Sequence, residues 1–221
     1  MTEPDGPGAS AAGPEGLAAG HGSSERLAER LVASRILHTG RYLEFRLDTV
    51  ERADGTRAER DVVWHPGAVA ILAIDEADRV LLVRQFRLPA GQVLREIPAG
   101  TLDVDPLTRE VEDPDLAARR ELEEETGYRA GSWRKLASFW TAPGFASELM
   151  HLYLATDLSP ADDDQLGPDE DERLELDRIP APAAIEAAVR GEIADAKSLV
   201  ALLWLDRIRR DGAAGNDAAS G

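Results

Sequence analysis

The run AVAILAI, from Ala68 to Ile74, contains no polar side chain and is bounded by turn-forming residues. A short, fully apolar run of this kind predicts a buried β-strand. The segment DEAD at residues 75–78 predicts a turn, after which RVLLVRQFR (79–87) predicts a returning strand. A third apolar run, LMHLYLAT at residues 149–156, predicts a further strand. The centre of this chain is therefore expected to be a β-sheet.

Upstream of these strands, residues 41–64 predict an antiparallel pair. In RYLEFRLDTV the apolar residues Leu43, Phe45 and Leu47 alternate with polar ones, as in a strand with one solvated face. The segment ADGT at residues 53–56 predicts a hairpin turn. Helices are expected at three segments, Asp115–Thr126, Ala183–Arg190 and Ala194–Arg210. The order of strands, helix, strands and helices predicts an α+β fold.

The composition limits the classes of partner and ligand that the protein can bind. The chain has 221 residues, a formal net charge of −17 and no cysteine. The acidic balance argues against a nucleic-acid partner, because phosphate backbones are bound by Lys and Arg. A small phosphate-containing ligand remains compatible if a divalent cation lies between acid and phosphate. The absence of a secretory signal or an apolar run of about 20 residues predicts a cytoplasmic protein without membrane contact.

Both ends of the chain are expected to be disordered. Residues 1–22 and 211–221 are rich in Gly, Ala, Pro and polar residues, which bury too little surface to offset the entropy of ordering. Residues 23–210 are expected to form one domain. Its parts are N-terminal strands at about 41–64, a core at about 65–180 and C-terminal helices at 181–210.

The segment AARRELEEETGY (117–128) crowds four glutamates into five positions. Asp113 and Pro114 suit the start of a helix and Gly127 suits its end, with Leu116 and Leu122 expected on the buried side. Glu121, Glu124 and Glu125 stand at i, i+3 and i+4, so their carboxylates converge and repel. A hard divalent cation such as Mg²⁺ would relieve that repulsion, because it binds carboxylates together with substrate phosphates. The alternative is a solvated acidic helix face.

The run RELEEETGY, from Arg120 to Tyr128, resembles the core of the Nudix box, G-x5-E-x7-R-E-U-x-E-E-x-G-U, where U is a bulky apolar residue. Glu112 stands eight residues before Arg120, as in the pattern. The opening glycine does not match, since the pattern's position is Pro106 and the natural candidate is Gly100 of EIPAG. The intervening loop is therefore about six residues longer than the pattern, which a surface loop tolerates.

Other segments are similar to the ADP-ribose pyrophosphatase branch of the Nudix family over roughly residues 40–210. They are VLLVRQFR, REIPAGTLD, TAPGFASE, GPDEDERLEL and GEIADAKSLVALLWL. The resemblance implies a Nudix fold, with a mixed sheet between helices. It also implies a homodimer whose N-terminal strands reach the partner. The implied reaction is Mg²⁺-dependent hydrolysis of ADP-ribose to AMP and ribose 5-phosphate, with Mn²⁺ as an alternative cofactor.

The resemblance also assigns roles to individual residues. The positions that match metal ligands are Glu121, Glu125, the carbonyl of Ala99 and Glu172. The positions that match the catalytic group are Glu170, Glu124 and Arg120. The positions that match substrate-binding residues are Arg84, Arg87, Gly144 and Glu148. Which of Glu170 and Glu172 is the base and which the ligand stays open, with Glu170 favoured as base. Simpler alternatives are a solvated acidic loop around residue 170, an ordinary Pro-Gly turn at Gly144, and edge-strand arginines.

Three functional alternatives stay open. The first is another Nudix substrate: a nucleotide sugar, a dinucleoside polyphosphate, FAD or NADH. Among all these substrates, the PAG and APGF segments favour ADP-ribose or a nucleotide sugar. The second is a non-catalytic module that binds ADP-ribose. The third is a purely structural role, which would leave the glutamate cluster without an explanation.

Overall fold

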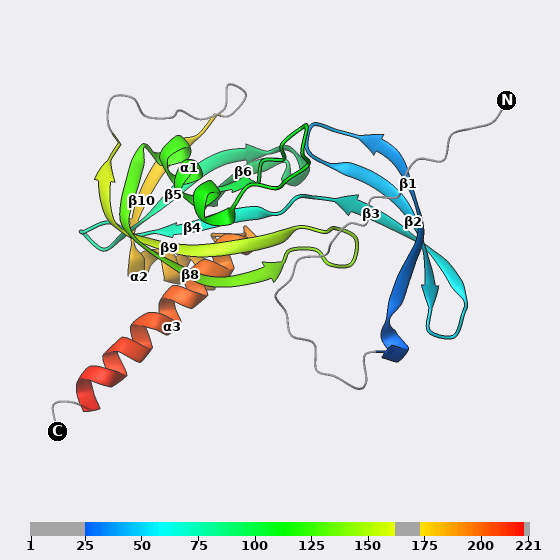
Figure 1. Cartoon of the computed structure of the whole chain (residues 1–221). Coiled ribbons are helices and arrows are strands. Elements are labelled where there is room, and N and C mark those ends of the chain that lie inside the picture. Colours follow the sequence, from blue (N-terminus) through cyan, green and yellow to red (C-terminus); the bar gives the residue numbers. More distant parts are fainter. Residues whose placement is uncertain (1–24, 162–172, 219–221) are drawn as a thin grey trace. The chain divides into compact units, whose positions relative to one another are not determined.

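The computed structural model describes residues 25–161 and 173–218 (Figure 1). The sequence-based expectation of disorder at residues 1–22 concerns a segment outside these ranges. The chain divides into two compact units, of which one combines Met1–Ser34 with Asp48–Arg60 and the other combines Arg35–Leu47 with Asp61–Gly221.

The N-terminal strands form a three-stranded sheet in the order β1-β2-β3, preceded by a short 3-10 helix, η1. The predicted turn at residues 53–56 is confirmed, because the Gly55 N–H donates to the Arg52 carbonyl at 2.9 Å and Gly55 has a φ of +81°. The first strand was missed, because its apolar residues do not alternate and most of its side chains are exposed. The bounds are η1 Glu25–Leu27, β1 Glu29–Thr39, β2 Glu44–Arg52 and β3 Arg57–Trp64.

The larger unit contains two further sheets. One has the order β7-β4-β9-β8 and is mixed, because β4 lies parallel to β9 while its other pairs are antiparallel. The other has the order β10-β5-β6 and is antiparallel. The bounds are β4 Ala68–Ala73, β5 Arg79–Arg87, β6 Gln92–Glu96, β7 Ala99–Thr101, β8 Tyr128–Trp140, β9 Leu149–Pro160 and β10 Glu175–Pro180.

Strand β4 is the centre of the core, with every side chain at most 4% exposed. Successive side chains of a strand point to opposite faces, so β4 contributes to two hydrophobic clusters. Val69, Ile71 and Ala73 pack with Leu122 of α1. The other face packs against α2 and α3. The expected α+β layering is confirmed, since Figure 1 shows α1 on one side of β4 and β9 and the C-terminal helices on the other.

All three expected helices are present, with different ends. Their bounds are α1 Pro114–Thr126, α2 Ala181–Val189 and α3 Ala196–Ala218, and a 3-10 turn, η2, spans Leu88–Ala90. Helix α3 continues past Arg210, where a disordered tail was expected. The pairs Arg207–Asp211 and Asp206–Arg210, each at i and i+4, support this extension.

The placement of Leu116 on the buried face of α1 was wrong. Leu116 is 62% exposed, whereas Leu122 is fully buried. Residues six apart lie about 120° from each other around a helix, so both cannot face the same sheet. The buried face instead runs through Ala117, Ala118 and Leu122.

This difference predicts unequal effects of the same substitution on one helix. Leu122→Ala is expected to lower the free energy of unfolding by about 2–5 kcal/mol, because it leaves a cavity against β4. Leu116→Ala, the matched control, is expected to change it by less than about 0.5 kcal/mol. Urea unfolding followed by circular dichroism measures both values. Equal losses for the two variants would contradict the assignment of the buried face.

Candidate active site

Helix α1 is held at both ends by the residues that the sequence indicated. The Asp113 carboxylate accepts the Asp115 N–H at 2.7 Å, and Pro114 occupies the first turn. Gly127 ends the helix with a φ of +69°, and its N–H donates to the Glu123 carbonyl at 2.8 Å. These caps set where the helix stops, and therefore where the glutamates of its last turns lie.

Arg120 gathers three of the acidic side chains. Its Nη1 donates to Glu121 Oε1 and to Glu124 Oε2, both at 2.8 Å. Its Nε and Nη2 donate to Glu112 at 3.2 and 2.9 Å. Burial by itself would lower the pKa of Arg120, but the bond with Glu112 and the neighbouring carboxylate charges outweigh it and raise the pKa. Arg120 thus contacts three acidic side chains at once, and its orienting role stays a prediction from the sequence.

Glu112 reaches Arg120 although the loop before it is longer than the Nudix pattern. The extra residues fold into a turn, in which the Asp105 carboxylate accepts the N–H groups of Leu107 and Thr108 at 2.8 and 2.7 Å. The Glu112 N–H then donates to the Asp103 carbonyl at 2.8 Å. Burial would raise the pKa of Glu112, but hydrogen bonding from Arg120 lowers it. The insertion is thus closed on itself and leaves the glutamate in register.

Strand β7 brings backbone atoms against the same carboxylates. The Ala99 N–H donates to Glu125 Oε2 at 3.0 Å. A Cβ atom added to Gly100 would lie only 1.9 Å from the carboxylate carbon and Oε1 of Glu121. Glycine at this position therefore allows the carboxylate to lie directly against the strand.

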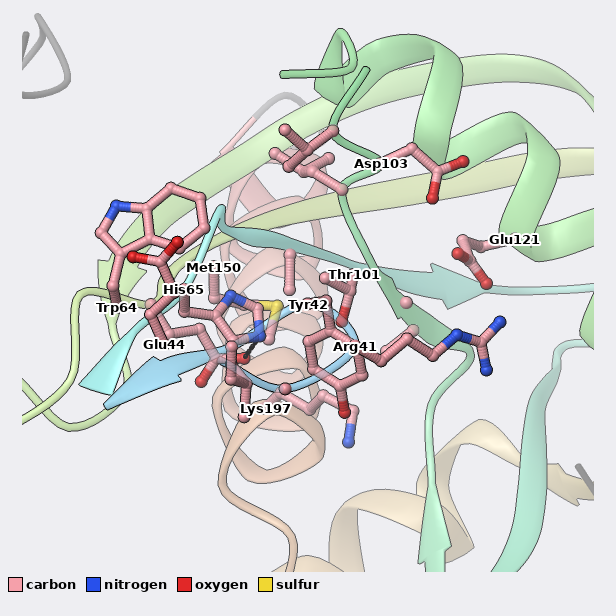
Figure 2. A pocket seen from close by; sticks show the side chains of 18 of the residues that line it. Arg41, Tyr42, Glu44, Trp64, His65, Thr101, Asp103, Glu121, Met150 and Lys197 are labelled. Carbon is pink, nitrogen blue, oxygen red and sulfur yellow. Dashed lines mark ion pairs between the residues drawn. The ribbon is translucent and has the colours of Figure 1, made fainter. Parts of the chain in front are cut away.

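These groups face a cavity of about 1010 Å³ in the larger unit. Figure 2 shows Glu121 and Asp103 on one side of it and Trp64 and His65 on the other. Five of its lining residues are Arg or Lys although the chain is acidic as a whole; they are Arg41, Arg87, Arg109, Arg120 and Lys197. The cavity therefore combines cations with a carboxylate cluster, as a bound diphosphate and a divalent cation together would require.

Six of the predicted site residues line this cavity, namely Arg87, Ala99, Arg120, Glu121, Glu124 and Glu148. Glu125 is not a lining residue; it is 9% exposed, and its carboxylate accepts the N–H of Ala99, which does line the cavity. Two others are not among the lining residues. Arg84 pairs with Glu175 of β10 at 2.8 Å, and Gly144 lies in the loop before β9. The remaining two, Glu170 and Glu172, lie outside the described residues.

Glu148 is held at the cavity by groups that the sequence did not single out. Its carboxylate accepts the Thr141 hydroxyl, and its Oε1 lies 3.7 Å from His65 Nε2. His65 Nδ1 accepts the Gly67 N–H at 3.0 Å, so the neutral ring carries its proton on Nε2, toward Glu148. Burial lowers the pKa of His65, and the charge of Glu148 opposes that shift. His65 and Glu148 lie 83 positions apart in the sequence, so no local pattern indicated their contact.

A second cluster lies at the floor of the cavity and was also missed. Glu96 is 1% exposed and accepts two hydrogen bonds of 2.8 Å from Arg87. Lys197, from the start of α3, donates to the same carboxylate. Burial would raise the pKa of Glu96, but the bond with Arg87 and the charge of Lys197 outweigh it and lower the pKa. Glu96 is therefore a buried carboxylate that stays ionised between two cations.

The donor atoms at the box helix suit a hard divalent cation, since they are carboxylate oxygens and the Ala99 carbonyl. Among residues 25–161 and 173–218, no group of three or more His, Cys, Asp or Glu side chains is arranged around a common metal position. Arg120 instead shares the oxygens of Glu121 and Glu124. The residues thus fit such a cation in chemistry, and its binding would redistribute the contacts of Arg120.

Comparison with known proteins shows the family of the chain. The NUDIX domain model matches residues 64–201. The chain is 37% identical to an ADP-ribose pyrophosphatase of Bacillus subtilis, covering 81% of this chain and 93% of the relative. It is 38% identical to a methanol dehydrogenase activator of Bacillus methanolicus (80% and 92%) and 34% identical to a GDP-mannose pyrophosphatase of Cronobacter sakazakii (69% and 83%).

A crystal structure of an ADP compounds hydrolase superposes with a TM-score of 0.67 at 22% identity, covering 83% of this chain and 95% of that one. The chain therefore belongs to the Nudix family and has the Nudix fold that the box predicted. Nudix hydrolases act with divalent metal ions. No helix in the part of the chain that the structure describes is long and apolar enough to cross a membrane.

The contact between Gly100 of β7 and Glu121 is expected to affect metal affinity. Gly100→Ala is expected to push the Glu121 carboxylate away from the strand, because the added methyl would overlap it. Metal affinity, measured by titration with Mn²⁺ and electron paramagnetic resonance, should fall by at least about tenfold. The melting temperature should change little, since the side chain that must move ends in the cavity. Wild-type Mn²⁺ affinity in this variant would show that the close approach has no role in metal binding.

Proposed function

We propose that this protein is a Mg²⁺-dependent Nudix hydrolase that splits the diphosphate of ADP-ribose into AMP and ribose 5-phosphate. The observation that carries the proposal is the meeting of two box acids, Glu121 and Glu124, with cationic residues at one cavity. The chain is also 37% identical to an ADP-ribose pyrophosphatase, of which it covers 93%. The retained glutamates argue against a non-catalytic binding module.

The roles of the residues follow from their positions. Glu121, Glu124, Glu125 and the Ala99 carbonyl would hold the cation, and Arg120 would orient the carboxylates as they exchange contacts. When bound, the cation would neutralise diphosphate charge and acidify a water molecule. Arg87 would bind a phosphate oxygen, and Glu148, kept in place by Thr141, would face the substrate. Glu170 as the base and Glu172 as a further ligand stay predictions from the sequence, as do Arg84 and Gly144 as substrate contacts.

A second candidate substrate is GDP-mannose or another nucleotide sugar, because a GDP-mannose pyrophosphatase is 34% identical over 83% of its length. The same metal site would serve both substrates, since each presents a diphosphate. They differ in the base and in the sugar, which the walls of the cavity must distinguish.

A substrate panel with a matched pair of variants tests the proposal. Wild type with Mg²⁺ is expected to hydrolyse ADP-ribose with a higher kcat/KM than GDP-mannose. Glu125→Gln should lower kcat by at least about 100-fold, because it removes a charged oxygen donor at the metal position. Glu123→Gln is the control, since Glu123 lies on the same helix but pairs with Arg129, at 2.6 Å, away from the cavity. Full activity of Glu125→Gln on every substrate would refute the metal-site assignment.

Mg²⁺ is the proposed cofactor because the expected ligands are all hard oxygen donors, and Mn²⁺, which the same donors suit, stays the alternative. The cytoplasmic location stays a prediction from the sequence. The panel run with each metal separately, at equal free concentrations, compares them directly.

We also propose that the protein is a homodimer. Strand β1 exposes several large apolar side chains, with Leu31 at 53%, Ile36 at 54% and Leu37 at 41%, and such surfaces on a sheet favour a protein contact. Light scattering coupled to size exclusion is expected to give a mass of about twice 23.9 kDa. Leu31→Glu with Ile36→Glu should shift the protein toward the monomer, because charges at an apolar interface oppose association. A wild-type mass of one chain at micromolar concentration would contradict the dimer.

A further inference from the structure

The start of helix α3 is tied to the segment that leads into β7. Ser198 Oγ accepts the Ile97 N–H at 2.8 Å and donates to Asp195 Oδ2 at 2.6 Å. Lys197 Nζ lies 3.1 Å from Asp195 Oδ1 and also donates to Glu96. Ser198 is fully buried and the Lys197 side chain is 11% exposed. One turn of a helix thus contacts two consecutive residues, Glu96 and Ile97, that lie 101 positions earlier in the chain.

The charges in this cluster balance. Arg87 and Lys197 are cations, and Glu96 and Asp195 are anions, with all four among the residues that line the cavity. Glu96 holds Arg87 in a fork, by Nε and Nη2 at 2.8 Å each, so Nη1 is not part of that pair. A fork of two parallel bonds fixes the plane of the guanidinium as well as its position.

The same segment continues into the box site. The Pro98 carbonyl accepts the Ile71 N–H of β4 at 2.8 Å, and the Ala99 N–H donates to Glu125. Moving Glu96 and Ile97 would therefore shift both Arg87 and the backbone against which the box carboxylates lie. Loss of the Lys197 charge would leave a net negative buried group beside Arg87, which weakens the attraction for an anionic ligand.

We propose that Lys197 is a positioning residue for substrate binding: by holding buried Glu96 it orients the Arg87 guanidinium and fixes residues 96–99 at the floor of the cavity. The effect of Lys197 on substrate binding rests on the proposed function, since that effect assumes an anionic diphosphate substrate. Ser198 supports the same contact through the Ile97 N–H. The position of Arg87 is thus decided by a helix that supplies none of the box residues.

The test compares two cationic residues of α3, Lys197 and Arg209, each of which binds a carboxylate outside the helix. Lys197→Met is expected to raise KM for the hydrolysed diphosphate by about tenfold with kcat changed less than about threefold, because substrate binding rather than the reacting group is disturbed. Lys197→Arg should restore most of the wild-type KM. Arg209→Met is the control, because Arg209 anchors the same helix to Asp78 by two bonds of 2.7 Å and does not line the cavity. It should leave KM unchanged even if the melting temperature falls.

A second readout does not depend on activity. Hydrogen–deuterium exchange of the Ile97 and Ala99 amides, measured on the full chain, should become at least about tenfold faster in Lys197→Met and stay unchanged in Arg209→Met. In a Glu96→Gln background, Lys197→Met should change KM by less than about threefold, since the charge that it balances is gone.

The outcomes separate the two proposals. A wild type that hydrolyses no substrate in the panel refutes the proposed function, and exchange at Ile97 and Ala99 then decides the positioning role alone. An active wild type with unchanged KM and unchanged exchange in Lys197→Met overturns the role of Lys197 and leaves the proposed function intact. Equal acceleration of exchange in Lys197→Met and Arg209→Met also overturns it, because the effect would then be general loss of stability.

Discussion

Carboxylates can crowd at the end of α1 because the guanidinium of Arg120 lies among them. Its planar group has five N–H donors, which suffice for Glu112, Glu121 and Glu124 at once. Without it, like charges would meet near a helix C-terminus, where the helix dipole also disfavours anions. The arginine brings the acids together, and a cation bound by the same oxygens would redistribute its contacts. The position of the helix end, set by Asp113 and Gly127, and the close approach of β7 at Gly100 depend on the same arrangement.

The cavity is built on a strand that is buried on both faces. One face of β4 packs on α1 and so fixes the box helix, and the other packs on α2 and α3 and so fixes the start of α3. Two sites that are far apart in sequence, the box acids and the Lys197 cluster, are thereby attached to opposite sides of one rigid element. Their side chains meet again beside β7, where residues 96–100 contact both.

The inserted loop shows how a local pattern survives a change of length. Six additional residues would move Glu112 by many ångströms if they were extended. The turn at Asp105 and the contact between Asp103 and Glu112 close the insertion, so that Glu112 still reaches Arg120. The longer loop brings Arg109 to the wall of the cavity, which the pattern alone did not indicate.

Much of the architecture was predictable from the sequence because its signals are local. Apolar runs predicted β4, β5 and β9; Gly55 marked a turn; Asp113, Pro114 and Gly127 marked the ends of α1. Leu116 was misplaced because two leucines six apart were read as one face without the helical angle between them. β1 was missed because its side chains do not alternate, and the α3 extension was missed because Gly-containing tails predict disorder.

The sequence alone determined the spacing of Glu121, Glu124 and Glu125 on one helix, and with it the chemistry of the box. Only the tertiary structure decided which residues surround that helix. Glu96 meets Lys197, and His65 meets Glu148, across long separations in the sequence. These pairs come together because β4 packs between two layers.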